Sequence, residues 1–269
     1  MVTRRHIRHL LFLAFSVGIA APTFARQETA PGVAEVRACM ARASPQASVE
    51  SDLVLETHAE GDAIQRLELK LYGKRDQHGR MRVLLRIEDP PDLRGYTLLV
   101  RERPEGDPEI FTYLPELRTV RRITGRALSG SLFGTDLFYE DLLELLAFSR
   151  AGKVERRADE VLDGRPVYVL VAIPPQAVRS AYVQITTLVD REVCILRRAS
   201  FYDRPDHLAK ELLVPWDTII TEGAFRIPQL VIVKNIAKGS ETRLRTIHTL
   251  YDAGLRDSLF TTAELAQGR

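Results

Sequence analysis

Apolar and polar residues alternate along most of this chain, which is the period of a β-strand with one buried and one solvated face. The clearest case is Leu67, Leu69 and Leu71, which alternate with charged residues. The same period returns in further segments: 81–87, 96–101, 110–114, 119–123, 167–173, 183–189, 194–202, 230–236 and 244–251. Turn residues such as Asp163-Gly164, and a hairpin turn over 76–79, separate these segments. The pattern predicts a long antiparallel meander.

Two segments have helical spacing instead. Residues 33–43 predict a short helix near the start, and 141–148 predict the only strong internal helix. Thr135 or Asp136 could serve as the N-cap of the internal helix, and acidic residues follow in its first turn. The expected fold is therefore mainly β, a strongly curved antiparallel sheet or unclosed β-barrel with a few short helices. The concave apolar face of such a sheet must be covered. One means is helices and loops laid across it, and the candidates are the N-terminal helix, the loop over 89–95 and the segment over 125–148.

The stretch from 110 to 142 is the most informative part of the chain. Two short strands end at Pro115 and Gly125, and a Gly/Ser-rich loop that contains Leu132 and Phe133 then leads to Asp136. Two apolar residues in such a loop need a place to be buried. This succession of short strands and an apolar loop is typical of a binding protein, and the stretch contains no obvious catalytic group.

This stretch, I-F-T-Y-L-P-E-L-R-T-V-R-R-I-T-G-R-A-L-S-G-S-L-F-G-T-D-L-F-Y-E-D-L, resembles the LolA-like outer-membrane lipoprotein-sorting family. That family has a similar pattern, L-P-x-L-R-x-V-R-R-I followed by F-x-G-T-D-x-x-Y-E-D-L. Looser similarities are Cys-Met-Ala-Arg-Ala at 39–43, Asp-Arg-Glu-Val-Cys at 190–194, and Leu-Phe-Thr at 259–261 with Leu265. The family usually has Phe-Met where this chain has Leu132-Phe133. The resemblance implies one carrier domain over 26–269, in which helices form a lid over an apolar cavity.

Candidate site residues follow from the alternation and the resemblance together. The cavity wall is expected from inward-facing strand residues: Leu67, Leu69, Leu71, Val83, Leu85, Ile87, Val169 and Val171. Each of these could instead be ordinary core. The lid is expected to contain Leu132, Phe133, Phe138 and Leu142. The alternative for the lid is a loop that packs permanently on the domain.

The first 25 residues predict a secretory signal peptide. A basic start is followed by an apolar core over 10–21 and by small residues that end at Ala25, so cleavage is expected after about Ala25. Such a core is too short to span a bilayer, which takes roughly 20 apolar residues. No cysteine follows the core directly, so a lipid-anchored start is not expected. These features predict an exported protein of the periplasm.

Cys39 and Cys194 are the only two cysteines. An exported protein with an even number of cysteines can form a disulfide, and this pair could form one. The alternative is two separately buried thiols.

The charge balance argues against nucleic acid as a partner. The formal net charge is +2, and three arginines belong to the predicted signal peptide, so the remainder is nearly neutral. Arg118, Arg121, Arg122 and Arg126 form a local basic run. Such a run is usually a solvated face, and otherwise it would contact anionic lipid headgroups or a partner protein.

Residues for catalysis or for binding a metal or cofactor are not evident. Ser131 lies in a glycine-rich loop, but the G-x-S-x-G spacing of a nucleophile elbow is missing. The four histidines after the signal are well separated and do not form a metal-binding spacing. No phosphate-binding glycine motif follows a strand. We therefore expect neither an enzyme nor a cofactor.

Without catalytic groups, an exported β protein is expected to bind a ligand, and the free energy of transferring hydrocarbon out of water favours an apolar cargo. Hiding one methylene from water is worth about 0.8 kcal/mol, so a 16-carbon chain needs roughly 13 kcal/mol of shelter. The leading hypothesis is a periplasmic carrier that receives a lipid or acylated protein from an inner-membrane transporter, during transient membrane contact, and passes it toward the outer membrane. The family's association with lipid export suggests a proton-driven exporter as that transporter. The alternatives are a sensor of mislocalised lipids or lipoproteins and a lipid-ester hydrolase.

Overall fold

The computed structural model describes residues 31–43, 48–61, 63–146, 152–175, 179–222 and 225–267. The predicted signal peptide and its cleavage site lie outside the described residues. The same holds for positions 147 and 148 of the predicted internal helix. Residues 31–269 form one compact unit, and the helices of its described part include none that has the length and apolar character needed to cross a bilayer.

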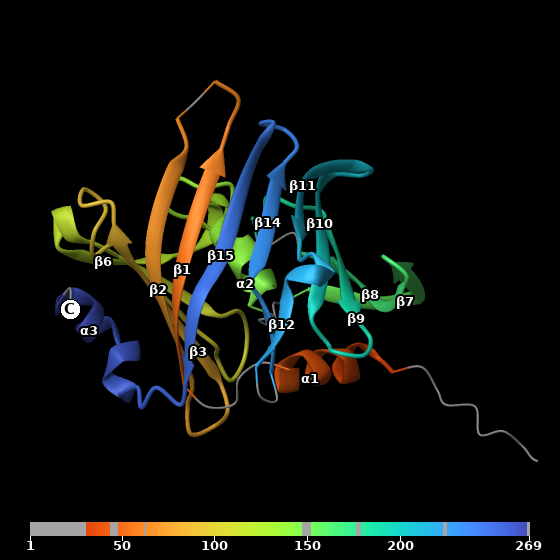
Figure 1. The fold of residues 1–269 in the computed structure, drawn as a ribbon, viewed down its shortest axis with the longest axis horizontal. Helices are drawn as coiled ribbons and strands as arrows, with labels where there is room; N and C mark the ends of the chain where they lie inside the picture. Colours follow the sequence, from red (N-terminus) through yellow and green to blue (C-terminus); the bar gives the residue numbers. More distant parts are fainter. Residues whose placement is uncertain are drawn as a thin grey trace, which may run out of the picture. The chain divides into compact units, whose positions relative to one another are not determined.

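Thirteen of the described strands form one antiparallel sheet (Figure 1). Their order across the sheet is β6-β5-β4-β3-β2-β1-β15-β14-β11-β10-β9-β8-β7. The strands are β1 (Val49–His58), β2 (Gln65–Arg75), β3 (Met81–Asp89), β4 (Thr97–Arg101), β5 (Glu109–Leu114), β6 (Thr119–Ile123), β7 (Lys153–Leu162), β8 (Arg165–Ile173), β9 (Gln184–Asp190), β10 (Leu196–Arg204), β11 (His207–Leu213), β14 (Leu230–Asn235) and β15 (Ser240–Tyr251). A separate hairpin pairs β12 (Ile219–Glu222) with β13 (Phe225–Pro228).

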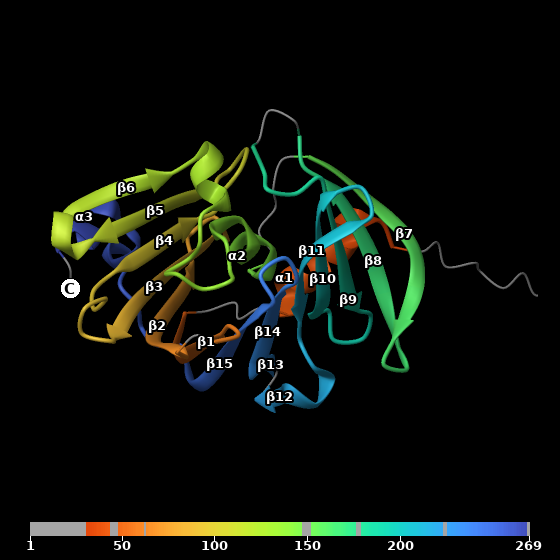
Figure 2. The same cartoon turned by 90° about the horizontal axis from the view of Figure 1, so that it is seen from above.

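The sheet is not closed, because β6 and β7 form its two edges. Seen from above, it curves around the helices α1 (Val33–Ala43) and α2 (Tyr139–Leu145) (Figure 2). The third helix, α3 (Thr262–Gln267), lies near the edge formed by β6, with contacts to β4, β5 and β6. The prediction of a mainly β fold with an unclosed antiparallel sheet and a few short helices is confirmed.

Side chains are buried on both faces of parts of the sheet. Val83 and Leu85 face the main core, whereas Leu84 between them packs with Phe260 and Leu265 of the C-terminal segment. Successive side chains of a strand point to opposite faces. The apolar run in β3 therefore reflects two covered faces, and the C-terminal segment supplies the second cover.

Helix α1 has the bounds that the sequence predicts, and a disulfide attaches it to the sheet. Val36 and Met40 bury its apolar side in the main core. Cys39 of α1 is bonded to Cys194, in the turn between β9 and β10, with 5.6 Å between the Cα atoms. That separation is usual for a disulfide. Of the two alternatives for the cysteines, the structure has the bonded pair.

The start of α2 differs from the prediction. Its N-cap is Phe138, and neither Thr135 nor Asp136 caps it. The carboxylate of Asp141 accepts a hydrogen bond from the backbone N–H of Phe138 at 2.8 Å, so an acidic residue within the first turn satisfies this end of the helix. Thr135 donates its hydroxyl to the carbonyl oxygen of Leu132 at 2.7 Å and thereby closes the preceding turn. The two predicted cap residues are used elsewhere.

Candidate functional site

An apolar cavity of about 310 Å³ lies on the inner side of the sheet. Its wall is formed by β1, β2, β3 and β15, by both α1 and α2, and by the β12–β13 hairpin. Typical members are Leu53 of β1, Met40 of α1, and Leu145 and Leu146 at the end of α2. The volume is at the lower end of the range of small-molecule pockets, about 300–1,000 Å³. An interior of this character is suited to hydrocarbon.

Four of the residues predicted for the cavity wall lie on it: Leu69, Leu71, Val83 and Leu85. Leu67 and Ile87 belong to the same hydrophobic cluster and are completely buried, but they do not line the cavity. They occupy positions further along β2 and β3, where packed side chains fill the space. Which of the wall residues contact cargo stays a prediction.

The prediction for Val169 and Val171 is wrong. Both pack in a separate cluster with Val167 and Leu188, whereas Leu170 between them reaches the main core. The two valines therefore occupy the other face of β8. Apolar residues run almost continuously through this strand, so its period does not reveal which face is the inner one.

Two of the four residues predicted for the lid line the cavity, and two do not. Leu132 and Leu142 are buried and contribute to its wall. Phe133, which has a positive φ of 53°, packs at the margin of the core. The ring of Phe138 stacks on that of Tyr182, with 6.3 Å between the centroids. Neither phenylalanine reaches the cavity.

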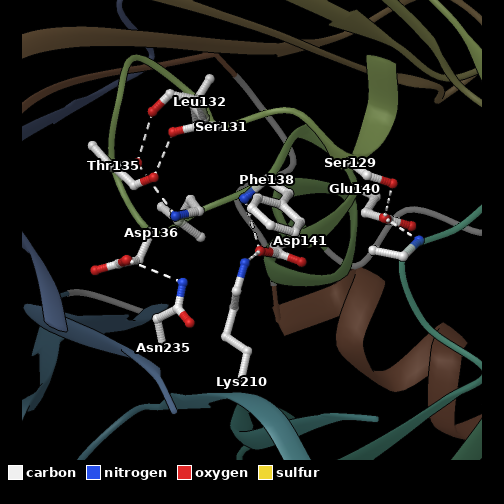
Figure 3. A network of polar contacts seen from close by, with 12 residues as sticks. Ser129, Ser131, Leu132, Thr135, Asp136, Phe138, Glu140, Asp141, Lys210 and Asn235 are labelled. Carbon is white, nitrogen blue, oxygen red and sulfur yellow. Dashed lines mark hydrogen bonds and ion pairs between the residues drawn. The ribbon is translucent and has the colours of Figure 1, made fainter. Parts of the chain in front are cut away.

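The segment of residues 132–145, here called the motif segment, crosses the inner face and is attached to the sheet by buried carboxylates (Figure 3). The first is Asp136, which accepts hydrogen bonds from Ser240 Oγ at 2.6 Å, Thr242 Oγ1 at 3.0 Å and Asn235 Nδ2 at 3.3 Å. The backbone N–H of Asp136 in turn donates to Thr242 Oγ1 at 3.0 Å. These contacts fix the start of the segment to β14 and β15.

Glu140 is the second buried carboxylate, and it is completely enclosed. It accepts hydrogen bonds from Ser180 Oγ at 2.6 Å, from Ser129 Oγ at 2.9 Å and from the backbone N–H of Ala181 at 2.9 Å. Ser129 precedes the motif segment, and Ser180 and Ala181 precede β9. Glu140 therefore joins the motif segment to a distant part of the chain.

The third is Asp141, which forms a buried ion pair with Lys210 of β11 at 2.5 Å (Figure 3). It also accepts a hydrogen bond from the hydroxyl of Tyr182 at 2.7 Å. The ammonium group of Lys210 lies over the ring of Phe138, 3.4 Å from the centroid. Burial raises the pKa of Asp141 and lowers that of Lys210, and the charge of each partner opposes the shift of the other.

Together these carboxylates attach the motif segment to the middle of the sheet and to the segment before β9. Asp136 reaches β14 and β15, whereas Asp141 reaches β11 and Tyr182, two residues before β9. Removing the segment from the sheet would leave buried charges without partners, which is costly. The acidic residues of the Y-E-D-L motif are thus anchors, and the segment they hold forms part of the cavity wall.

Ser131, the possible metal ligands and the basic run were also considered in the sequence, and the structure shows where each lies. Ser131 donates its hydroxyl to the carbonyl oxygen of Thr135 at 2.5 Å. Within the described residues no cluster of three or more His, Cys, Asp or Glu side chains could hold a metal ion. In the basic run, Arg118, Arg121 and Arg126 are exposed, and Arg122 pairs with Glu109 at 3.2 Å. The run lies on and beside the edge strand β6 and does not contribute to the cavity wall.

Comparisons with known proteins agree with this architecture. A family model described as an uncharacterized protein matches residues 79–267. A DUF1329 family protein from Desulfovibrio piger has 24% sequence identity and a TM-score of 0.75, over 86% of this chain and 96% of that one. A domain described as an outer membrane lipoprotein-sorting protein, from Vibrio parahaemolyticus, has 22% identity and a TM-score of 0.75, over 87% and 98%.

A LolA superfamily protein from Nitrosomonas europaea has 18% identity and a TM-score of 0.66, over 87% of this chain and 100% of that one. A search of curated proteins gives no match. At these identities the solved structures show a shared fold. The family model covers more than half of the chain.

Proposed function

We propose that this chain, which belongs to the family whose model matches residues 79–267 and has the LolA-like fold, is a periplasmic carrier of acyl chains. Its cargo would be a lipid or an acylated protein, taken from an inner-membrane transporter and passed toward the outer membrane. The observation that supports this most directly is the apolar cavity between the curved sheet, α1 and the motif segment. The likeness in fold to a lipoprotein-sorting protein domain agrees with it.

The energetic argument is the transfer of hydrocarbon through water. Each methylene that enters the cavity is worth about 0.8 kcal/mol, so a chain of 16 carbons gains roughly 13 kcal/mol when it is fully sheltered. A wall of Leu, Val and Met side chains supplies that shelter. The carrier makes and breaks no covalent bond, so the direction of transfer must come from differential affinity along the route or from energy supplied by the transporter.

We place the route of entry at the end of the cavity formed by α1 and the β12–β13 hairpin. The wall residues at this end include the half-buried Ala43, Met81 and Phe225 and the exposed Arg226. The opposite wall contains the motif segment, which three buried carboxylates hold in place. Movement of the β12–β13 hairpin at this end would leave those carboxylates paired and the disulfide of α1 intact.

A transfer assay between vesicles tests the carrier function. Donor vesicles contain a self-quenching fluorescent fatty acid, acceptor vesicles contain none, and a carrier is expected to increase the rate of dequenching in proportion to its concentration. A sensor would bind the lipid without accelerating its movement, and a hydrolase would release new products from a lipid ester. Binding without acceleration would therefore contradict the carrier proposal and favour the sensor.

A further inference from the structure

Five side chains on the cavity wall can donate a hydrogen bond: Ser51, Thr246, Thr249, Tyr251 and Arg226. All the other side chains of the wall are apolar or, at Cys194, part of the disulfide. A buried polar group is costly unless it has a partner, and an exposed one can bind water. The donors without a partner in the protein are therefore the ones available to a ligand.

Three of the five have partners in the protein. The hydroxyls of Ser51 and Thr249 lie 2.9 Å apart and form a hydrogen bond between β1 and β15. The hydroxyl of Thr246 donates to the carbonyl oxygen of Pro228 at 3.3 Å. These groups stabilise the wall and are not free to bind cargo.

The remaining two are the guanidinium group of Arg226 and the hydroxyl of Tyr251. In the described part of the chain neither forms a hydrogen bond or an ion pair through these groups. Arg226 is on β13, and Tyr251 is the last residue of β15. The ring of Phe225, next to Arg226, stacks on that of Tyr251 with 5.0 Å between the centroids. This contact places the hairpin against the end of β15, and both Arg226 and Tyr251 line the cavity there.

The electrostatics of this end favour an anion. Arg226 is the only charged residue on the cavity wall as described, and no carboxylate lines it. Burial, with a smaller contribution from the charge of Glu222, raises the pKa of Tyr251 to about 12. The phenol therefore remains a hydrogen-bond donor at neutral pH. A guanidinium and a phenol together can hold a carboxylate or phosphate by charge-assisted hydrogen bonds.

The geometry points to a cargo with one anionic head, a carboxylate or a phosphate, which binds to Arg226 and Tyr251 while its hydrocarbon chain fills the cavity. This inference rests on the proposed function, because it specifies the cargo of the same cavity. It assigns Arg226 and Tyr251 as residues that determine specificity. The head lies at the end where we place the entrance, so the chain enters first and the head remains near the solvent.

Equilibrium binding of three probes with the same 16-carbon chain tests the inference: palmitate, hexadecyl phosphate and hexadecanol. Wild-type protein is expected to bind at least one anionic probe about tenfold more tightly than hexadecanol. Arg226→Gln should remove that preference and leave the affinity for hexadecanol within about twofold. Tyr251→Phe should reduce it in part. Arg204→Gln is the matched control, because Arg204 is 68% exposed and is not on the cavity wall.

The outcomes separate this inference from the proposed function. Preference for palmitate alone or for hexadecyl phosphate alone supports the inference and identifies the head. Equal affinity of all three probes for wild-type protein overturns the inference but supports the carrier function. An anionic preference that persists in both Arg226→Gln and Tyr251→Phe also overturns it. If no probe binds to correctly folded protein, the proposed function itself fails.

Discussion

The ammonium group of Lys210 and the carboxylate of Asp141 lie 2.5 Å apart, and both side chains are almost completely buried. Asp141 is in the first turn of α2, and Lys210 is in the middle of β11. The pair attaches the motif segment to the sheet at a completely buried position. The ion pair gives the aspartate of the Y-E-D-L motif a structural role.

Removing one partner of this pair should destabilise the fold. We expect Lys210→Met or Asp141→Asn alone to lower the free energy of unfolding by about 3–5 kcal/mol, because each leaves an uncompensated buried group. The double variant should lose much less than the sum of the two single losses. Urea denaturation followed by circular dichroism measures all four proteins. Strictly additive losses would show that the two side chains are not coupled.

The disulfide should make a large contribution to stability. It joins residues separated by 155 positions, and closing a loop of that length stabilises a chain by about 4–5 kcal/mol in the chain-entropy model. Cys39→Ser with Cys194→Ser should therefore lower the midpoint of guanidinium denaturation and should loosen α1 from the sheet. A denaturation midpoint that neither this double variant nor a reductant changes would contradict the prediction.

Asp190 should contribute to the dependence of stability on pH. Burial alone would raise the pKa of its carboxyl, but hydrogen bonds from Arg165 and from the backbone amides of Val193 and Glu192 outweigh it and hold the pKa below its usual value. The folded pKa is below the unfolded value of about 3.9, so this contribution is present above pH 4 and is lost as the pH falls through the folded pKa.

The substitution Asp190→Asn should therefore weaken the loss of stability below pH 4, and it should also reduce stability at neutral pH. Urea denaturation at a series of pH values from neutral to acid measures both effects. Asp206→Asn, at an exposed turn, controls for the removal of one negative charge. If Asp190→Asn loses stability below pH 4 as steeply as the wild type, Asp190 does not make this contribution.

Filling the cavity should reduce binding without unfolding the protein. Leu71 lines the cavity and is half-buried, so Leu71→Trp can place its larger side chain in the empty volume. We expect its affinity for hexadecanol to fall at least tenfold, with a change of less than about 1.5 kcal/mol in the free energy of unfolding. Leu117→Trp is the control, because Leu117 is 55% exposed and lies outside the wall. Equal affinity in both variants would place the ligand elsewhere.

The sequence predicted most of the strands that have a clear period, although β1 was not among the predicted segments, and it missed others in which another requirement disturbs the period. Strand β11 was missed because Lys210 alternates with Leu208 and Leu212 along the strand. A lysine at such a position normally indicates a solvated face, and only the tertiary structure shows its buried partner, Asp141. Strand β7 was missed because it is an edge strand with charged and exposed side chains. Charged edges of this kind discourage further strand pairing.

The candidate site was predicted in part for similar reasons. Leu69 and Leu85 were correctly placed on the cavity wall because β2 and β3 alternate. Val169 was misplaced because β8 is apolar on both faces. Arg226 and Tyr251 were not found, since nothing in the local sequence shows that the β12–β13 hairpin packs against the end of β15. Only the tertiary contact between Phe225 and Tyr251 brings the hairpin to this end of the cavity.

The central claim is that the apolar cavity holds a hydrocarbon chain, and the lipid that accompanies the purified protein tests it most directly. The protein is exported into a bacterial periplasm, purified without detergent, and examined by native mass spectrometry and by solvent extraction. We expect about one amphiphile per protein chain in the wild type and far less in Leu71→Trp. Wild-type protein that carries no lipid, and that takes up neither palmitate nor hexadecanol when they are added, would contradict the account.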